Sequence, residues 1–279
     1  MQAKQSGPIG VFDSGVGGLT VLRALQQQLP QESFLYLGDT ARVPYGTRTK
    51  AEIIQFGWEI ITWMLSQQVK MVVMACNTSS ALALDEIRQS LPVPVLGLIL
   101  PGARAAIRSG DRIGVIATPA TVQSQAYPRA IHEINPQAQV WQVDCPEFVP
   151  LIEQNQIHTP ETVAIVAEYL ERLLVHDINT LVYGCTHYPH LAPIIERLLP
   201  TTVRSIDPAL AVSQAARQEL QVLGLGSLSC HYGNTRFGVT GEPEQFTQVA
   251  RQWLNAPLNT EKVYLSSPQL APGILNSVD

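Results

Sequence analysis

The sequence predicts an α/β fold with two pseudo-symmetric α/β domains, each built on a mostly parallel sheet, and an active site in the cleft between them. Two observations lead to this prediction. Short apolar runs alternate along the chain with segments of helical periodicity, which is the order expected of parallel strands joined by helices. The same order of elements begins again near residue 112, so the second half of the chain repeats the plan of the first.

The first unit begins with an apolar strand over 9–12, followed by a glycine-rich turn and a helix over 19–29. A second strand is expected over 34–37. Apolar residues then recur at helical spacing, which predicts an amphipathic helix that packs on the sheet. These residues are Ile54, Trp58, Ile61 and Leu65. The run over 71–74 is apolar throughout and predicts a buried central strand that ends just before Cys76.

The second unit repeats the start and the end of the first. The segment RIGVI over 112–116 resembles PIGVF over 8–12, and a strand predicted over 180–183 leads into Cys185. The glycine of this motif precedes Cys76 by 66 positions in the first unit and precedes Cys185 by 71 positions in the second. We interpret this similarity as an internal duplication.

The remaining segments give the expected boundaries of the two domains. Thr159 and Pro160 predict the start of a helix, because threonine caps helices and proline suits the first helical position. The segment 96–101 is expected to be the first crossover, and Asp207-Pro208 is expected to begin a helix over 209–223. A strand over 237–240 and a helix over 245–254 should follow. We therefore expect a discontinuous first domain, a second domain and a mobile C-terminal tail; their ranges are 1–97 with 208–265, 98–207 and 266–279.

Composition and charge narrow the class of protein. The chain has 279 residues, of which 46% are hydrophobic and 15% charged, and its net charge is −5. Lys and Arg are nowhere concentrated, so we expect no nucleic-acid partner and no anionic membrane surface. The first residues lack the pattern of a signal peptide, and the most apolar window, 93–107, is interrupted by two prolines and an arginine. We expect a soluble, cytoplasmic globular protein with free thiols.

Two of the four cysteines occupy equivalent places in the duplicated units. Cys76 and Cys185 each follow a predicted buried strand and precede a predicted helix. Ligands bind at this edge of open α/β sheets, and a helix N-terminus stabilises a thiolate or an anionic substrate there. Two thiols on opposite sides of a cleft can remove a proton from one face of a carbon centre and deliver one to the other. Cys145 and Cys230 have no such context and are expected to be inert.

Two neighbouring side chains are candidate assistants of these thiols. Asp13 lies at the same sheet edge as Cys76, where it can accept a proton or cap a helix, and His187 follows Cys185 by two residues. Polar side chains also concentrate in the segments 38–46 and 118–121, the second of which can present hydroxyl groups or a helix N-terminus to a carboxylate.

Several other kinds of site are weighed against this one. The glycines that follow Asp13 have the spacing G-x-G-G rather than the dinucleotide-binding G-x-G-x-x-G. A metal site of Cys185, His187 and His190 lacks a convincing further ligand. No lysine follows a phosphate-binding glycine or serine loop, so pyridoxal phosphate is not expected. We therefore expect neither cofactor nor metal. A single-cysteine hydrolase would need only one of the two thiols, and a non-catalytic binding protein would need neither.

Six motifs together resemble the glutamate racemases of the cofactor-independent aspartate/glutamate racemase superfamily. They are IGVFDSGVGGLTVL, YLGDTARVPYGTR, ACNTSSALAL, IGVIATPATVQSQAY, FVPLIE and YGCTHYPHL, and the similarity extends over roughly residues 8–255. The resemblance implies that Cys76 and Cys185 transfer the protons, with Asp13, His187 and Glu153 as assistants. Glu147 competes with Glu153 for this last role. The implied substrate-binding residues are Asp13, Ser14, Tyr45, Gly46, Asn77, Thr78, Thr186 and His187.

The resemblance also implies a physiological role and a partner. Interconversion of L- and D-glutamate would supply D-glutamate for peptidoglycan, and the family favours a homodimer. Asp39 matches a further acidic position of the family, without a clear role. A sister racemase that acts on aspartate or another amino acid is the nearest alternative, because the length of the pocket decides which side chain fits.

Overall fold

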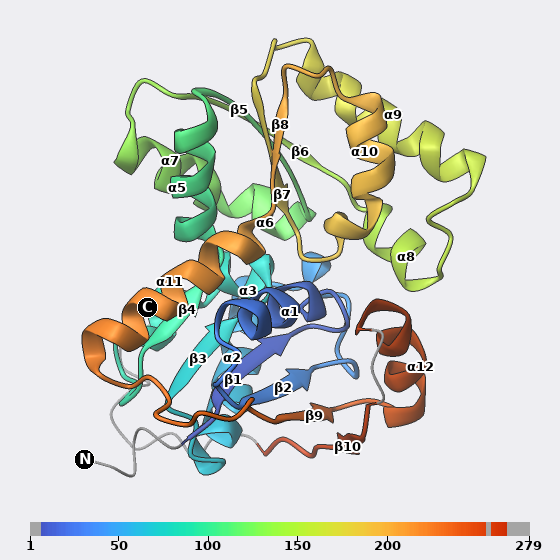
Figure 1. The fold of residues 1–279 in the computed structure, drawn as a ribbon. Coiled ribbons are helices and arrows are strands. Elements are labelled where there is room, and N and C mark those ends of the chain that lie inside the picture. The colour runs from blue at the N-terminus through green and yellow to red at the C-terminus, as the bar shows by residue number, and fades with distance from the viewer. Residues whose placement is uncertain (1–6, 255–257, 267–279) are drawn as a thin grey trace.

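The computed structural model describes residues 7–254 and 258–266 and arranges them around two parallel sheets (Figure 1). The larger sheet has six strands in the order β10-β9-β2-β1-β3-β4, and the smaller has four in the order β6-β5-β7-β8. Every strand pairing in both sheets is parallel. Since parallel strands need crossover connections, helices cover the faces of the sheets. The predicted fold class is confirmed.

The strands of the larger sheet are β1 (Ile9–Asp13), β2 (Phe34–Gly38), β3 (Met71–Met74), β4 (Val95–Gly97), β9 (Thr235–Val239) and β10 (Thr260–Lys262). Those of the smaller sheet are β5 (Arg112–Ala117), β6 (Gln139–Asp144), β7 (Thr180–Gly184) and β8 (Arg204–Ile206). The helices of the first half are α1 (Leu19–Gln28), α2 (Lys50–Ser66), α3 (Asn77–Leu82), α4 (Leu84–Arg88), α5 (Ile99–Ser109), α6 (Pro119–Ser124) and α7 (Ala126–Ile134). Those of the second half are α8 (Phe148–Glu153), α9 (Pro160–Leu174), α10 (Ala192–Leu198), α11 (Pro208–Leu223) and α12 (Pro243–Leu254), and two short 3-10 helices are η2 (Tyr45–Thr47) and η3 (Tyr188–Leu191).

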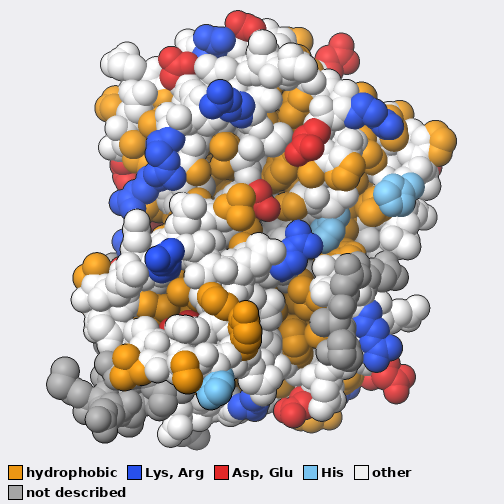
Figure 2. All heavy atoms as spheres, viewed as in Figure 1, with side chains coloured by type: hydrophobic (Ala, Val, Ile, Leu, Met, Phe, Trp, Pro, Cys, Tyr) orange, Lys and Arg blue, Asp and Glu red, His pale blue; other side chains and the backbone are white. Residues whose placement is uncertain are grey.

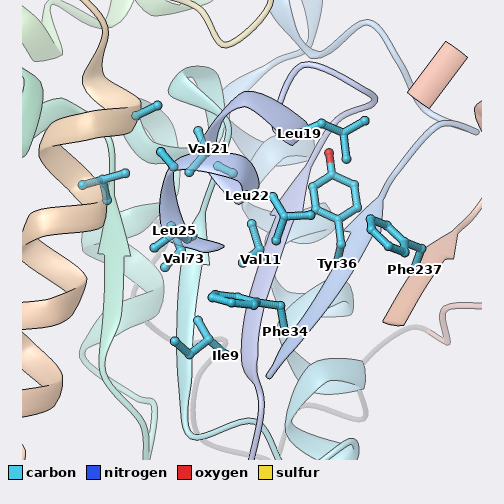
Figure 3. Packing of buried hydrophobic residues seen from close by; sticks show 14 of the residues in the cluster. Ile9, Val11, Leu19, Val21, Leu22, Leu25, Phe34, Tyr36, Val73 and Phe237 are labelled. Atoms are coloured by element: carbon cyan, nitrogen blue, oxygen red, sulfur yellow. The ribbon is translucent and has the colours of Figure 1, made fainter. Parts of the chain in front are cut away.

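The core of the larger sheet has two layers because alternate residues of each strand point to opposite faces. Ile9 and Val11 of β1 pack with helices α1, α11 and α12, whereas Phe12 packs on the other face with α2. Figure 3 shows the first layer, in which Val11 and Tyr36 meet Leu22 of α1. The smaller sheet is covered in the same way, by α5 and α7 on one face and by α9 and α10 on the other.

The chain passes between the two sheets twice. It leaves the larger sheet after β4 and returns to it through α11, which lies between the two sheets in Figure 1. Within the segment 96–101, where the first crossover was expected, Leu96 and Gly97 end β4 and Pro101 lies in the first turn of α5. Asp207 caps α11 as expected, by accepting a hydrogen bond from the amide of Ala209. These two passages support our proposed division of the chain at 97/98 and 207/208.

Two further features concern the surface and the end of the chain. In the part of the chain that the structure describes, no helix is long and apolar enough to span a bilayer. On the face shown in Figure 2, the Lys and Arg side chains are scattered over both halves of the molecule. The predicted mobile tail, 266–279, lies outside the described residues except for Ser266.

Candidate active site

A pocket lies between the two sheets, where their carboxyl edges face each other. All of its lining segments follow the carboxyl end of a strand: Ser14 after β1, 43–47 after β2, 76–78 after β3, 118–119 after β5, 145–150 after β6 and 185–187 after β7. This is the edge at which open α/β sheets bind ligands, because loops and helix N-termini converge there. The predicted site residues of both units follow strands that end at this edge.

The two predicted thiols line this one pocket. Cys76 and Cys185 are both nearly buried, with 4% and 6% of their surface exposed. Cys76 is the N-cap of α3, as expected. After Cys185 the prediction of a helix is only partly correct, because the 3-10 helix η3 comes first and α10 begins at Ala192.

Burial decides the protonation of Cys76. It raises the pKa of this thiol to about 12, and the nearby Asp13 carboxylate adds to the effect, against the opposing influence of hydrogen bonds from Ser79. The expectation that a helix N-terminus stabilises a thiolate is therefore outweighed at this position, and Cys76 is a thiol at neutral pH.

Cys185 has a different environment, formed by His187 and Glu153. Nδ1 of His187 lies 3.7 Å from Sγ of Cys185, and its Nε2 lies 2.7 Å from Oε1 of Glu153. Burial lowers the pKa of His187, but the hydrogen bonds to Cys185 and Glu153 outweigh it and raise the pKa well above its usual value. The contacts with Cys185 and Glu153 therefore favour the charged form of the His187 ring more than water does.

The geometry separates the two acidic residues that compete for the role of assistant. Glu153 ends α8 and contacts His187, whereas Glu147 accepts a hydrogen bond from the hydroxyl of Tyr169. Glu153 therefore lies at the site, and Glu147 contacts helix α9 instead.

Asp13 is fully buried at the end of β1 and joins both halves of the site. Its carboxylate accepts hydrogen bonds from the amides of Gly15 at 3.0 Å and Gly18 at 2.9 Å, and from the hydroxyl of Thr186 at 3.4 Å. Burial raises its pKa, while His187 and the backbone donors oppose that rise. Asp13 thus orders the glycine-rich loop and also influences the charge of Cys76. Because two amides of the loop bind Asp13, they are not free to bind a phosphate.

Glycines allow the two halves of the site to approach closely. A Cβ on Gly17 would lie 2.5 Å from Nδ1 of His187, and one on Gly46 would lie 2.9 Å from Cβ of Thr118. Real Cβ atoms do not approach other atoms so closely, so these positions require glycine.

The predicted substrate-binding residues all reach the pocket, apart from Asp13, which lies behind Ser14. The residues that line it are Ser14, Tyr45, Gly46, Asn77, Thr78, Thr186 and His187. Tyr45 donates a hydrogen bond to the buried Asp39, which also binds Nε of Arg42 at 2.7 Å and the hydroxyl of Thr240 at 2.7 Å. Asp39 therefore lies behind Tyr45 and orders the loop that carries it.

Of three further residues near the pocket, Thr118 was expected there from the sequence, Cys145 was misjudged and Tyr127 was missed. Cys145 was expected to be an inert thiol without the strand-end context of the other two. It is buried and lines the pocket, because β6 pairs with β5 and ends at the same edge. Thr118 belongs to the polar segment 118–121; it lines the pocket, and its Oγ1 lies 3.0 Å from Oγ1 of Thr78. Tyr127 escaped notice and binds Asn77; no local motif marks such a contact between distant segments.

His190 belongs to a different environment from its neighbour His187. Its ring packs on Trp253, with ring centroids 3.5 Å apart, and burial lowers its pKa to about 3. Within 7–254 and 258–266, no group of three or more His, Cys, Asp and Glu residues is placed to hold a metal ion. The arrangement of Cys185, His187 and His190 therefore does not resemble a metal centre.

Comparison with known proteins agrees with this geometry. The model of the family described as Asp/Glu/Hydantoin racemase matches residues 9–216. The chain is 59% identical over 266 residues to the glutamate racemase of Microcystis aeruginosa, an alignment that covers 95% of this chain and 94% of that protein.

Two solved structures show the same fold. The glutamate racemase of Thermus thermophilus in complex with β-chloro-D-alanine has a TM-score of 0.85 and 42% identity, over 94% of this chain and 98% of that one. The glutamate racemase of Francisella tularensis in complex with D-glutamate has a TM-score of 0.87 and 36% identity, over 93% and 98% of the two chains.

Proposed function

The chain belongs to the Asp/Glu/Hydantoin racemase family and is an isomerase, and we propose that it interconverts L-glutamate and D-glutamate by transfer of protons between two cysteines and the substrate. The observation that carries the mechanism is the presence of Cys76 and Cys185 in one pocket, at equivalent edges of the two sheets. Racemisation requires a base on one face of the α-carbon and an acid on the other, and a pair of like groups serves both directions.

The two thiols have different neighbours, and this difference supports different roles for them at the start of the reaction. Cys76 is a thiol because burial raises its pKa, so it is the proton donor. Cys185 lies 3.7 Å from Nδ1 of His187, which can donate a hydrogen bond to its sulfur, so we assign it the role of base. The thiolate of Cys185 takes the α-proton and becomes a thiol, and the thiol of Cys76 gives its proton to the opposite face and becomes a thiolate.

The reverse reaction uses the same groups with their roles exchanged. After one inversion Cys76 carries the negative charge, which the enzyme must remove or use in the opposite direction. Asp13 lies close enough to influence the charge of Cys76, and its pKa is raised by burial, so it is the group placed to exchange a proton with that thiol. His187, supported by Glu153, serves Cys185 in the corresponding way.

Glutamate is the substrate favoured by the comparisons, because the similar proteins are glutamate racemases and one of them was solved with D-glutamate. Ser14, Asn77, Thr78 and Thr186 supply hydroxyl and amide groups that can bind carboxylates, and the loop of Tyr45 and Gly46 closes the opposite wall. In this proposal the reaction needs no cofactor, and D-glutamate is supplied to peptidoglycan synthesis in the cytoplasm. A homodimer is the expected assembly.

The alternative functions would require different residues or a different substrate. A single-cysteine hydrolase would use Cys185 with His187 and leave Cys76 dispensable, and a binding protein would need neither thiol. Aspartate is the nearest alternative substrate, since its side chain is one methylene shorter than that of glutamate.

The direct experiment incubates the purified, reduced protein with L-glutamate in D₂O, with a chelator and without added cofactor. The α-proton signal in NMR and the optical rotation are followed together, with L-aspartate as the matched control substrate. The proposal predicts loss of both signals with glutamate. Absence of exchange from either glutamate enantiomer, in folded protein, would contradict the assignment, and faster loss with aspartate would change the substrate.

A further inference from the structure

Tyr127 and Asn77 form a buried hydrogen bond that joins the two halves of the pocket. The hydroxyl of Tyr127, in α7, donates to Oδ1 of Asn77, in α3, at 2.7 Å. The two residues are 50 positions apart in the chain, and 0% and 3% of their surfaces are exposed. Tyr127 packs with α5 beside the smaller sheet, whereas Asn77 follows β3 of the larger one.

The hydrogen bond fixes which end of the Asn77 amide is free. Oδ1 is occupied by Tyr127, and Nδ2 is buried without a hydrogen-bond partner in the described part of the chain. An unpaired buried amide donor is costly, so this group calls for an acceptor that the protein itself does not supply. Asn77 lines the pocket, and a carboxylate is the acceptor that would satisfy it.

Tyr127 is suited to hold this orientation. Burial raises the pKa of its hydroxyl, so the group stays protonated and remains a donor. If the amide turned over, Nδ2 would face Tyr127 and an acceptor would face the pocket, where it would repel the carboxylate of the substrate.

The position of Tyr127 also links this contact to the passages between the sheets. A Cβ on Gly102 would lie 3.2 Å from the hydroxyl of Tyr127 and 3.2 Å from Cγ of Pro208. Gly102 lies in the first turns of α5, after the chain leaves the larger sheet, and Pro208 begins α11, by which it returns. The hydroxyl of Tyr127 therefore lies next to the first connection and near the start of the second, while it donates to Asn77 of the pocket.

We propose that Tyr127 is a positioning residue, whose hydroxyl orients Asn77 so that the amide Nδ2 donates to a carboxylate of the substrate. The inference rests on the proposed glutamate site for the identity of that carboxylate. The orientation of Asn77 in the free protein does not depend on it.

The test compares Tyr127→Phe with Tyr183→Phe, a matched control that removes the hydroxyl of a buried tyrosine which does not line the pocket. In protein labelled with ¹⁵N-asparagine, the Nδ2 signals of Asn77 are those that disappear in Asn77→Ala. We expect them to shift in ligand-free Tyr127→Phe and to stay unchanged in Tyr183→Phe. Unchanged signals in Tyr127→Phe would overturn the proposal, whatever the substrate.

Kinetics provide the second readout. Tyr127→Phe should raise KM for both glutamate enantiomers by roughly tenfold with little change in kcat, the effect of losing about one hydrogen bond. When Tyr127→Phe is combined with Asn77→Ala, KM should rise almost no further than in Asn77→Ala alone, since the two residues act through one interaction. An additive effect in the double variant would contradict the proposal.

Asn77→Asp tests the role of the donor Nδ2 separately from the hydrogen bond between Tyr127 and residue 77. A carboxylate there still accepts from Tyr127 but replaces the donor Nδ2 with an oxygen, so KM should rise further than in Asn77→Ala. A smaller rise than in Asn77→Ala would show that Nδ2 is not the group that binds the substrate. If the wild-type protein fails to racemise glutamate, the proposed function fails, while the NMR comparison in the free protein still decides the role of Tyr127.

Discussion

Glu153 Oε1 lies 2.7 Å from Nε2 of His187, on the opposite side of the ring from the Cys185 sulfur. This relay places a carboxylate, an imidazole and a thiol in series, and it differs from the environment of Cys76, where burial and Asp13 dominate. The two ends of the pocket are therefore chemically unequal, although the units that form them are similar.

Glu153→Gln should make folding stability less dependent on pH. The raised pKa of His187 means that its charged form stabilises the folded state fully below the unfolded value, about pH 6.5, and that this contribution is lost as pH rises through the folded pKa. Without the Glu153 carboxylate the folded pKa falls, so the variant should lose about 1.5–3 kcal/mol near pH 6 and much less at high pH. Urea unfolding at a series of pH values measures this.

Glu147→Gln is the matched control for this variant, because Glu147 contacts Tyr169 instead. In Glu147→Gln, the difference in unfolding free energy between low and high pH should be the same as in the wild-type protein. If the folding stability of Glu153→Gln and Glu147→Gln depended on pH to the same extent, Glu153 would not support the charge of His187.

The accessibility and the charge of the thiols predict an order of alkylation by iodoacetamide. Cys230 is exposed and should react first. Cys185 should react before Cys76 at neutral pH, because only thiolates are nucleophilic and the pKa of Cys76 is raised to about 12. Mass spectrometry of the peptides at successive times gives the order, and glutamate should protect the two pocket thiols but not Cys230. Modification of Cys76 before Cys185 would contradict the assigned roles of the two thiols.

Gly17→Ala should damage the site without removing any functional group. The added Cβ would lie 2.5 Å from Nδ1 of His187 and 2.7 Å from Oγ1 of Thr186, so the loop and the ring must move apart. A displacement on this scale costs catalysis about a hundredfold, and we expect a loss of that size in kcat/KM. Gly226→Ala is the control, because no atom lies within 4 Å of its Cβ. Normal activity of Gly17→Ala would show that the close approach is not required.

Much of the fold was predictable because the central strands are continuous apolar runs. The strand at 71–74 agrees with β3, and Thr159 caps α9 as expected, by accepting from the amide of Thr162. The edge strands β4 and β8 were missed because each has only three residues, and β8 includes Arg204 and Ser205, which carry no apolar pattern.

The site was predictable to the extent that its residues belong to local motifs. Cys76 and Cys185 stand at matching strand ends, which a duplication reveals, whereas Glu153 followed only from the resemblance. Cys145 and Tyr127 were beyond this reasoning, because their places depend on which strands pair and on how α7 packs against α3. Tertiary contacts of this kind leave no mark in nearby sequence.

The central claim is that both thiols are required, and racemisation by the two single variants tests it most directly. Cys76→Ala, Cys185→Ala and the exposed control Cys230→Ala are assayed in both directions, by circular dichroism and by loss of the α-proton in D₂O. The account predicts that Cys76→Ala and Cys185→Ala each lose racemisation by about a thousandfold or more, while Cys230→Ala retains it. Near-normal racemisation by either pocket variant, in both directions, would contradict the two-thiol mechanism.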